Sequence, residues 1–357
     1  MAKLPVPVRR TVKKMPVYHA PAEGRLRKLR LDFNENTVGC AAAVRRAVAR
    51  LSAQQLAMYP EYQVPTRSLA KYFRVRPQEL LLTNGADDAL RVIFDAFVDP
   101  GNGVLLAEPT FGMYRFYATL AGARVYSIRY DSLLRLPLET MLAAIRRRRP
   151  RVLFLANPNN PTGTLLDAAA LRRIIESATK TLVVIDEAYN EFSGGSALRW
   201  INRYCNLVVV RTFSKAAGLA GLRLGCLFAH RDVMAAFLRV ASPYPVNTAV
   251  LAAAVAAVRD SRSIQKYSRE ITLARAQLER DLARLGVRTF PSVANFLIAD
   301  FGSRGAKVTR LLEREEILVR DRSEDFARPG FVRITIGTRA QMRRVLAAIG
   351  RALGRHS

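Results

Sequence analysis

The sequence contains few of the residues that build disulfide frameworks or metal centres. Its 357 residues include three cysteines, Cys40, Cys205 and Cys226, which lie far apart and form no CxxC pair. A disulfide framework is therefore not expected, and a reducing, cytoplasmic compartment fits best. Only three histidines occur, without an HExxH motif or a Cys/His cluster, so no metal site is predicted.

Long apolar runs are also missing. No stretch approaches the roughly 18 apolar residues of a membrane span, and the run LAAAVAAV at 251–258 is too short. The N-terminal segment is basic and proline-rich and lacks the apolar core of a signal peptide. We therefore expect no membrane partner.

Acidic residues are scarce: 29 Asp and Glu stand against 57 Lys and Arg, which gives a net charge of +28. Such a charge can attract nucleic acid, and it also speeds the encounter with anionic small molecules. The arginines are spread along the whole chain, and no helix-turn-helix, zinc-finger or RNP pattern stands out. We expect small anionic substrates and no specific nucleic-acid partner. The alternative, a basic nucleic-acid-binding protein, predicts salt-sensitive binding to DNA or RNA.

Short apolar segments alternate with helical patterns from about residue 80. The expected strands are ELLLT, GVLLAEP, RVLFLANP, TLVVIDEAY, NLVVVRT and LGCLFA. This alternation predicts an α/β fold with a mostly parallel sheet between helices, which binds ligands at the carboxyl ends of its strands. We expect an extended N-terminal arm at 1–35, whose prolines disfavour early helix, and one helix at 41–51. A large domain at 36–255 and a smaller α+β domain at 256–357 would follow.

Polar residues gather where these strands end. They are Asn157 in NPNNPTG, Asp186 and Tyr189 in DEAY, and Ser214, Lys215 and Arg223 in TFSKAAGLAGLRLG. The turn Gly85-Ala86-Asp87 opens a helix, whose N-terminus favours phosphate. Each residue alone has an ordinary structural explanation, but together they match the needs of pyridoxal phosphate. This cofactor requires a lysine for its aldehyde, a carboxylate for its ring nitrogen, and donors for its phenolic oxygen and phosphate.

The same motifs carry a family resemblance. NPNNPTG (157–163), DEAY (186–189), TFSKAAGLAGLRLG (212–225) and RITIGT (333–338) resemble, in order and spacing, those of class I/II aminotransferases. These are pyridoxal-phosphate enzymes of fold type I, the aspartate-aminotransferase-like fold. The resemblance runs from LDFNEN at 31–36 to the last helix.

The resemblance implies catalytic roles for three residues. Lys215 would bind the cofactor covalently, and Asp186 would pair with its ring nitrogen. Tyr189 and Asn157 would hydrogen-bond the phenolic oxygen.

It also implies how the rest of the cofactor is held. Ser214, Arg223 and the turn Gly85-Ala86-Asp87 would bind the phosphate, and Phe111 in EPTFGMY would stack on the ring. Tyr59 in MYPEYQ would reach the cofactor phosphate of a neighbouring subunit, so a homodimer is expected.

Within the family, LRLDFNENTVGC, YPEYQ, GADDAL and SVANFLIAD resemble the histidinol-phosphate aminotransferases. That resemblance implies amino transfer between L-histidinol phosphate and 2-oxoglutarate in histidine biosynthesis. Arg333 would bind the glutamate carboxylate and share the substrate phosphate, and Arg320 would chiefly bind the phosphate, since guanidinium suits both anions. Asn157 and Tyr18 would complete the substrate site.

Two alternatives remain open at this point. Aromatic amino-acid aminotransferases share most of these motifs. Threonine-phosphate decarboxylases are lyases with the same fold and a similar phosphate site. The two reaction types differ in which bond at the α-carbon is broken, which a sequence rarely reveals.

Overall fold

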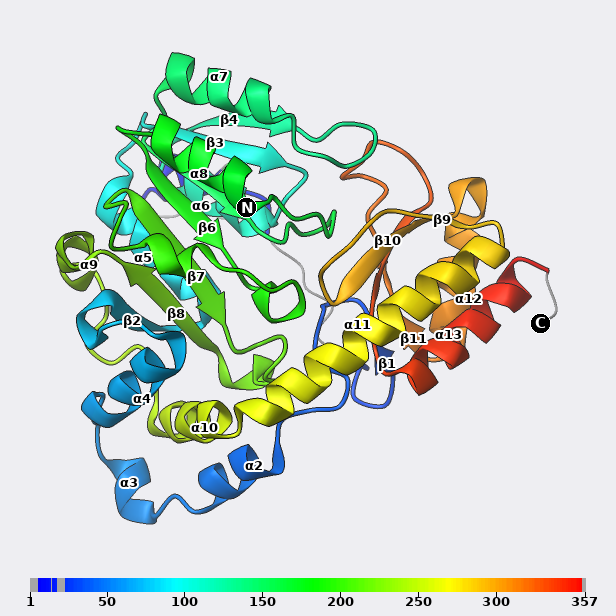
Figure 1. Ribbon diagram of the computed structural model, residues 1–357, viewed down its shortest axis with the longest axis horizontal. Coiled ribbons are helices and arrows are strands. Elements are labelled where there is room, and N and C mark those ends of the chain that lie inside the picture. The colour runs from blue at the N-terminus through cyan, green and yellow to red at the C-terminus, as the bar shows by residue number, and fades with distance from the viewer. Residues whose placement is uncertain (1–5, 14, 18–22, 355–357) are drawn as a thin grey trace.

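The computed structural model describes residues 6–13, 15–17 and 23–354. A seven-stranded sheet in the order β2-β8-β7-β6-β5-β3-β4 forms its centre (Figure 1). Its strands are Leu80–Asn84 (β2), Leu224–Ala229 (β8), Leu207–Thr212 (β7), Leu182–Asp186 (β6), Val152–Ala156 (β5), Gly103–Glu108 (β3) and Arg124–Arg129 (β4). Neighbouring strands run parallel except for β8, which is antiparallel to β2 and β7. The expected α/β fold with a mostly parallel sheet is confirmed.

The strands of this sheet are apolar because helices cover both of its faces. Leu153 on β5 and Val183 on β6 pack into one core, whereas Phe154 and Val184 pack into another on the opposite face. The first core is closed by α2 (Ala42–Ala49), α4 (Gln63–Phe73), α7 (Leu138–Arg148), α8 (Ala168–Ser177) and α10 (Thr248–Arg259). The second is closed by α5 (Gly85–Phe97), α6 (Gly112–Leu120) and α9 (Arg231–Leu238). This double cover explains the unbroken apolar runs.

A smaller antiparallel sheet follows in the order β12-β13-β10-β9. Its strands are Arg320–Asp321 (β12), Phe331–Thr335 (β13), Phe296–Asp300 (β10) and Arg288–Thr289 (β9), and its helices are α11 (Ser261–Arg284), α12 (Gly305–Arg314) and α13 (Arg339–Ala352). Figure 1 shows the long helix α11 leading from α10 to this sheet. Short 3-10 turns lie at Pro77–Glu79 (η1), Asn190–Phe192 (η2), Ala197–Trp200 (η3), Ala220–Leu222 (η4) and Gly302–Arg304 (η5). Among the described helices, none is long and apolar enough to cross a membrane.

The border between the two units lies near the start of α11. Ala257 and Val258, at the end of α10, are buried in the core of the large sheet. We therefore propose Asp260, between α10 and α11, as the border in place of residue 255. At the other end of the chain, β1 (Leu29–Arg30) pairs in parallel with β11 (Ile317–Leu318), which ties the N-terminal segment to the smaller unit.

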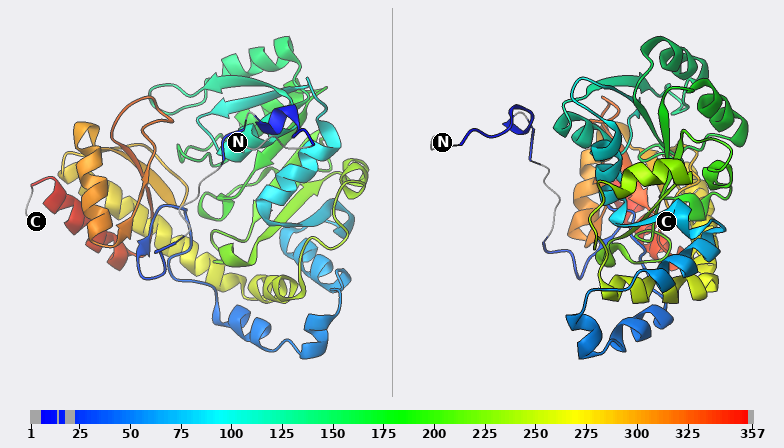
Figure 2. Two further views of the ribbon diagram at one scale, coloured as in Figure 1. Left: turned by 180° about the vertical axis from the view of Figure 1, so that it is seen from behind. Right: turned by 90° about the vertical axis from the view of Figure 1, so that its left-hand side faces the viewer.

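One local expectation was wrong, the end of one helix differs, and one strand was missed. The N-terminal arm contains a one-turn helix, α1 (Arg10–Lys13), which lies beside α6 in Figure 2. It forms because residues 8–15 contain no proline. The helix expected at 41–51 ends at Ala49, and Ser52 then caps a separate helix, α3 (Ala53–Ala57), by accepting from Gln55 N at 3.2 Å. Strand β4 was missed because it is a half-exposed edge strand with a weak apolar pattern.

Candidate active site

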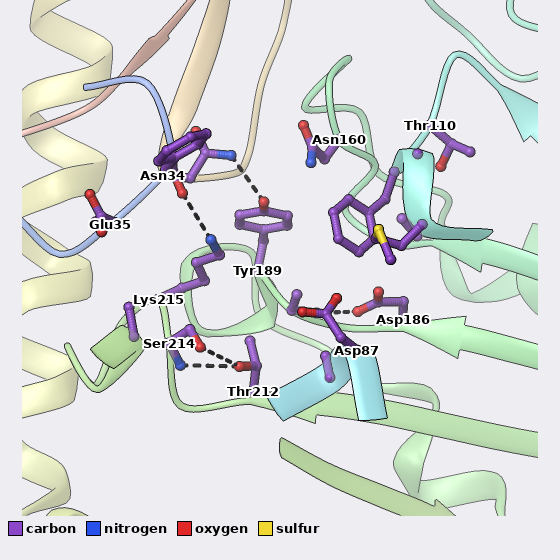
Figure 3. Close-up of a pocket in the computed structure, with 18 of the residues that line it drawn as sticks. Asn34, Glu35, Asp87, Thr110, Asn160, Asp186, Tyr189, Thr212, Ser214 and Lys215 are labelled. Atoms are coloured by element: carbon purple, nitrogen blue, oxygen red, sulfur yellow. Dashed lines mark hydrogen bonds between the residues drawn. The ribbon is translucent and has the colours of Figure 1, made fainter. Parts of the chain in front are cut away.

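A cavity of about 530 Å³ lies at the carboxyl ends of β5, β6 and β7 and extends to the smaller sheet. Figure 3 shows Lys215, Tyr189 and Asp186 together in it. The cavity is also lined by the predicted residues Ala86, Asp87, Phe111, Ser214, Arg223, Arg320 and Arg333. Residues from five motifs separated by up to 247 positions in the sequence therefore share one site.

Asp186 is the last residue of β6 and is buried. The Tyr114 hydroxyl donates to its Oδ2 at 2.7 Å, and Ala188 N donates to its Oδ1 at 3.0 Å. Burial raises the pKa of the Asp186 carboxyl to about 6 despite these bonds. A cationic ring nitrogen beside Asp186 would offset the cost of its buried charge.

Lys215 follows β7, lines the cavity and is half-buried. Its Nζ donates to Phe33 O at 2.9 Å and lies 5.8 Å from the centre of the Tyr189 ring. The turn after it requires a small residue: Gly218 has φ +72°, and a Cβ there would lie 2.8 Å from Gly39 O. The small residues after Lys215 therefore allow this turn to pack against the chain near residue 39.

A second group of residues, from the turn after β7, the segment before β8 and the first turn of α5, gathers at the start of α5. The Arg223 guanidinium lies 3.0 Å from the Asp87 carboxylate, and its Nη2 lies 2.6 Å from where a Cβ of Gly85 would stand. Ser214 lies nearby, with its N donating to Thr212 Oγ1 at 3.1 Å. Guanidinium, hydroxyl and helix N-terminus together suit a phosphate group. Phe111 lines the same cavity and packs edge-on against Tyr114.

Arginines occupy the end of the cavity formed by the smaller sheet. Arg333 on β13 is buried and donates to Asn160 Oδ1 at 2.5 Å and to the carbonyl of Asp32. Burial lowers the pKa of Arg333 to about 10, so it stays cationic at neutral pH. Arg320 on β12 pairs with Arg333 in the sheet register, which places both at the same end.

Comparison with known proteins identifies the family. The model for aminotransferase class I and II matches residues 27–349. This chain belongs to the class I and II aminotransferases. The aminotransferase is 35% identical to "Histidinol-phosphate aminotransferase 1" of Carboxydothermus hydrogenoformans, over 91% of this chain and 93% of that protein. It is also 35% identical to "Histidinol-phosphate aminotransferase" of Symbiobacterium thermophilum, over 97% and 99%.

A solved structure agrees with this membership. The histidinol-phosphate aminotransferase from Sinorhizobium meliloti, in complex with pyridoxal-5'-phosphate, is similar with a TM-score of 0.88 and 25% identity. The similarity covers 97% of both chains. The predicted resemblance to class I/II aminotransferases of fold type I is confirmed.

Three predicted site residues of the aminotransferase, Gly85, Asn157 and Tyr59, are not among the described residues that line the cavity. Asn157 uses its side chain on the backbone of Leu166, accepting from N at 2.8 Å and donating to O at 3.3 Å. We propose that Asn160, three residues on in the same turn, takes this role, because it lines the cavity and contacts Arg333. Tyr59 is 77% exposed and stacks on Tyr244. Tyr18 lies outside the described residues.

The sequence interpretation missed two supporting residues of the aminotransferase. Asn34 is buried and its Nδ2 donates to the Tyr189 hydroxyl at 2.9 Å. Tyr114 is fully buried against Asp186, and burial raises the pKa of its hydroxyl, which therefore stays protonated as a donor. Both residues lie inside quoted motifs, LDFNEN and EPTFGMY, but neither follows a predicted strand end.

Proposed function

We propose that this aminotransferase uses pyridoxal phosphate to transfer an amino group between L-histidinol phosphate and 2-oxoglutarate in histidine biosynthesis. The observation that carries the proposal is one cavity with Lys215 and Asp186 at the strand ends and arginines at the opposite end. The 35% identity to named histidinol-phosphate aminotransferases over nine-tenths of the chain supports this specificity above the two alternatives.

The residues of the cavity fit this cofactor. Lys215 would bind its aldehyde, Asp186 would pair with its ring nitrogen, and Tyr189 and Asn160 would hydrogen-bond its phenolic oxygen. The proposed phosphate site comprises Ala86, Asp87, Ser214 and Arg223, and Phe111 is the proposed stacking residue. When bound, the cofactor supplies an electron sink that stabilises negative charge at the substrate α-carbon.

The side chains of the cavity have separate roles in proton transfer and in substrate binding. The amine of Lys215 removes the proton from the substrate α-carbon and delivers a proton in the reverse direction, as a general acid–base. Asp186 keeps the ring nitrogen protonated, and Asn34 orients the Tyr189 hydroxyl. Arg333 binds the glutamate α-carboxylate and, with Arg320, the phosphate of the other substrate. The two half-reactions use the same site in turn, so the kinetics should be ping-pong.

The enzyme is proposed to act as a cytoplasmic homodimer. Tyr59 lies among exposed apolar side chains, which suits a surface that a second subunit covers. These side chains are Leu56, Met58, Val64 and Tyr244. Cys40, Cys205 and Cys226 are all free, as a reducing compartment favours.

A half-reaction assay tests the specificity. The cofactor-loaded enzyme is mixed in turn with L-histidinol phosphate, glutamate, phenylalanine and threonine phosphate, and conversion to the pyridoxamine form is followed by absorbance. We expect fast conversion by the first two and slow conversion by phenylalanine. Conversion by phenylalanine but not by histidinol phosphate would indicate an aromatic aminotransferase, and release of CO₂ from threonine phosphate would indicate a lyase.

Replacing Lys215 tests the chemistry. Lys215→Ala should remove the visible absorbance of covalently bound cofactor and lower turnover at least about a hundredfold, because the general base is lost. Lys180→Ala, an exposed lysine beyond α8, is the control and should behave as wild type. Full activity in Lys215→Ala would disprove the assignment.

A further inference from the structure

The loop between β12 and β13 brings a second charged pair to the substrate end of the cavity. Arg322 and Asp325 line the cavity together with Arg320 and Arg333. Neither residue has a role in the cofactor site proposed above. Their position beside the two proposed substrate-binding arginines raises the question of what they bind.

The pair is built into the loop. The Asp325 carboxylate forms an ion pair with Nε of Arg322, three residues earlier. Arg322 N donates to Phe331 O at 2.8 Å, and Asp325 N donates to Arg322 O at 3.1 Å. Phe326 packs on Phe331 with ring centres 4.8 Å apart. Both charged side chains are therefore held at the cavity wall by a fixed backbone.

The charges at this end favour a doubly negative ligand. Three guanidinium groups, those of Arg320, Arg322 and Arg333, face one carboxylate, that of Asp325. These four groups leave two positive charges, which a phosphate dianion or the two carboxylates of glutamate would balance. An aromatic amino acid brings only one carboxylate and would leave one positive charge unbalanced.

The Asp325 carboxylate is also poorly stabilised where it stands. Burial raises its pKa although Arg322, Arg333 and Arg320 act in the opposite direction. Because burial destabilises this carboxylate, a phosphate dianion, which has more charge and accepts more hydrogen bonds, can displace it from the arginine guanidinium. The other acidic group that acts on Asp325 is Glu324, next to it in the chain. Glu35, which also lines the cavity, is paired with Arg30.

We propose that Arg322 binds the substrate phosphate and that Asp325 is the counter-ion which the phosphate displaces from it. The pair then selects doubly charged substrates over aromatic amino acids. This inference rests on the proposed function, because it concerns the specificity of the same site.

Replacement of Arg322 tests the phosphate contact. In Arg322→Gln the KM for L-histidinol phosphate should rise roughly ten- to hundredfold, as for a lost charged hydrogen bond, with a much smaller change in kcat. The KM for phenylalanine should stay the same, and Arg322→Lys should recover part of the loss. Arg328→Gln is the matched control: Arg328 lies in the same loop, pairs with Asp300 at 3.7 Å, and lies outside the cavity lining.

Asp325→Asn tests the exchange. It should strengthen the binding of inorganic phosphate to the cofactor-loaded enzyme several-fold, measured by calorimetry without substrate, because a competing anion is removed. Weaker phosphate binding would mean that Asp325 only positions Arg322 or contacts another part of the substrate, which overturns the counter-ion role. If Arg322→Gln raised the KM for L-histidinol phosphate and for phenylalanine equally, or changed neither KM, the phosphate role of Arg322 would be overturned. A wild-type enzyme that binds phosphate through Arg322 but converts no histidinol phosphate would instead refute the proposed function. Thermal unfolding of each variant separates these outcomes from misfolding.

Discussion

Burial destabilises the charged carboxylate of Asp186 by more than its two hydrogen bonds stabilise it. Its pKa is raised to about 6, chiefly by burial, whereas an unfolded chain would hold the carboxyl near its ordinary value of 3.8. The folded chain therefore binds this proton more tightly than the unfolded chain does. Without cofactor, the contribution of Asp186 to stability falls as the pH rises from about 4 to above 6.

The first prediction follows from this shift. Relative to Asp186→Asn, the cofactor-free wild type should lose roughly 2–3 kcal/mol of unfolding free energy between pH 4 and pH 7. Asparagine has no charge to bury: its Oδ1 can accept from Ala188 N, and its Nδ2 can donate to the Tyr114 hydroxyl oxygen. Urea unfolding of both proteins at several pH values measures the difference. A constant difference across this range would contradict the raised pKa.

At the residue scale, the sequence predicted the side chains that directly follow buried strands. Lys215, Asp186 and Tyr189 line the cavity because the parallel strands β6 and β7 end at the same edge. The choice between Asn157 and Asn160 depends on which face of one tight turn each residue occupies. Apolar periodicity carries no signal for that choice, so only the folded turn could decide it.

At the scale of elements, the contact between β8 and the turn that begins α5 positions the residues of the proposed phosphate site. Gly225 on β8 lies against the backbone of Gly85, and a Cβ on Gly225 would stand 2.4 Å from the carbonyl carbon of Gly85. The buried strands of the large sheet were predictable from apolar runs, whereas the covering helices α4, α7 and α9 were not predicted. The edge strand β4 was missed as well, because it is half-exposed and its apolar pattern is weak.

Gly225→Ala tests this contact. The added methyl group should push the turn at Gly85 away from β8, destabilise the fold by about 1–3 kcal/mol, and weaken cofactor retention during dialysis. Gly112→Ala is the control for stability, because nothing lies within 4 Å of the added Cβ at the start of α6. Unchanged unfolding and retention in Gly225→Ala would mean that the turn can shift without cost.

At the scale of the whole molecule, two surface properties bear on function: the large net positive charge and an exposed apolar surface around Tyr59. The net charge of +28 suits a site for anionic substrates, since a positive field speeds their encounter. The exposed aromatic pair Tyr59 and Tyr244, stacked with ring centres 4.4 Å apart, lies beside further exposed apolar side chains. In an isologous dimer, the same surface of both subunits lies in the interface, so this apolar surface would be buried on each subunit.

Mixed dimers test whether Tyr59 acts across that interface. Tyr59→Ala and Lys215→Ala subunits should each form dimers of low activity. When the two variants are co-expressed with different tags, half of the dimers should contain one subunit of each kind. Each mixed dimer should then contain one site with both native residues, Tyr59 from one subunit and Lys215 from the other. Activity should therefore recover to about a quarter of the wild-type value, because one of two sites works in half of the dimers. If Tyr59 serves the cofactor of its own subunit, the mixture gains nothing over the separate variants, since no site then contains both residues.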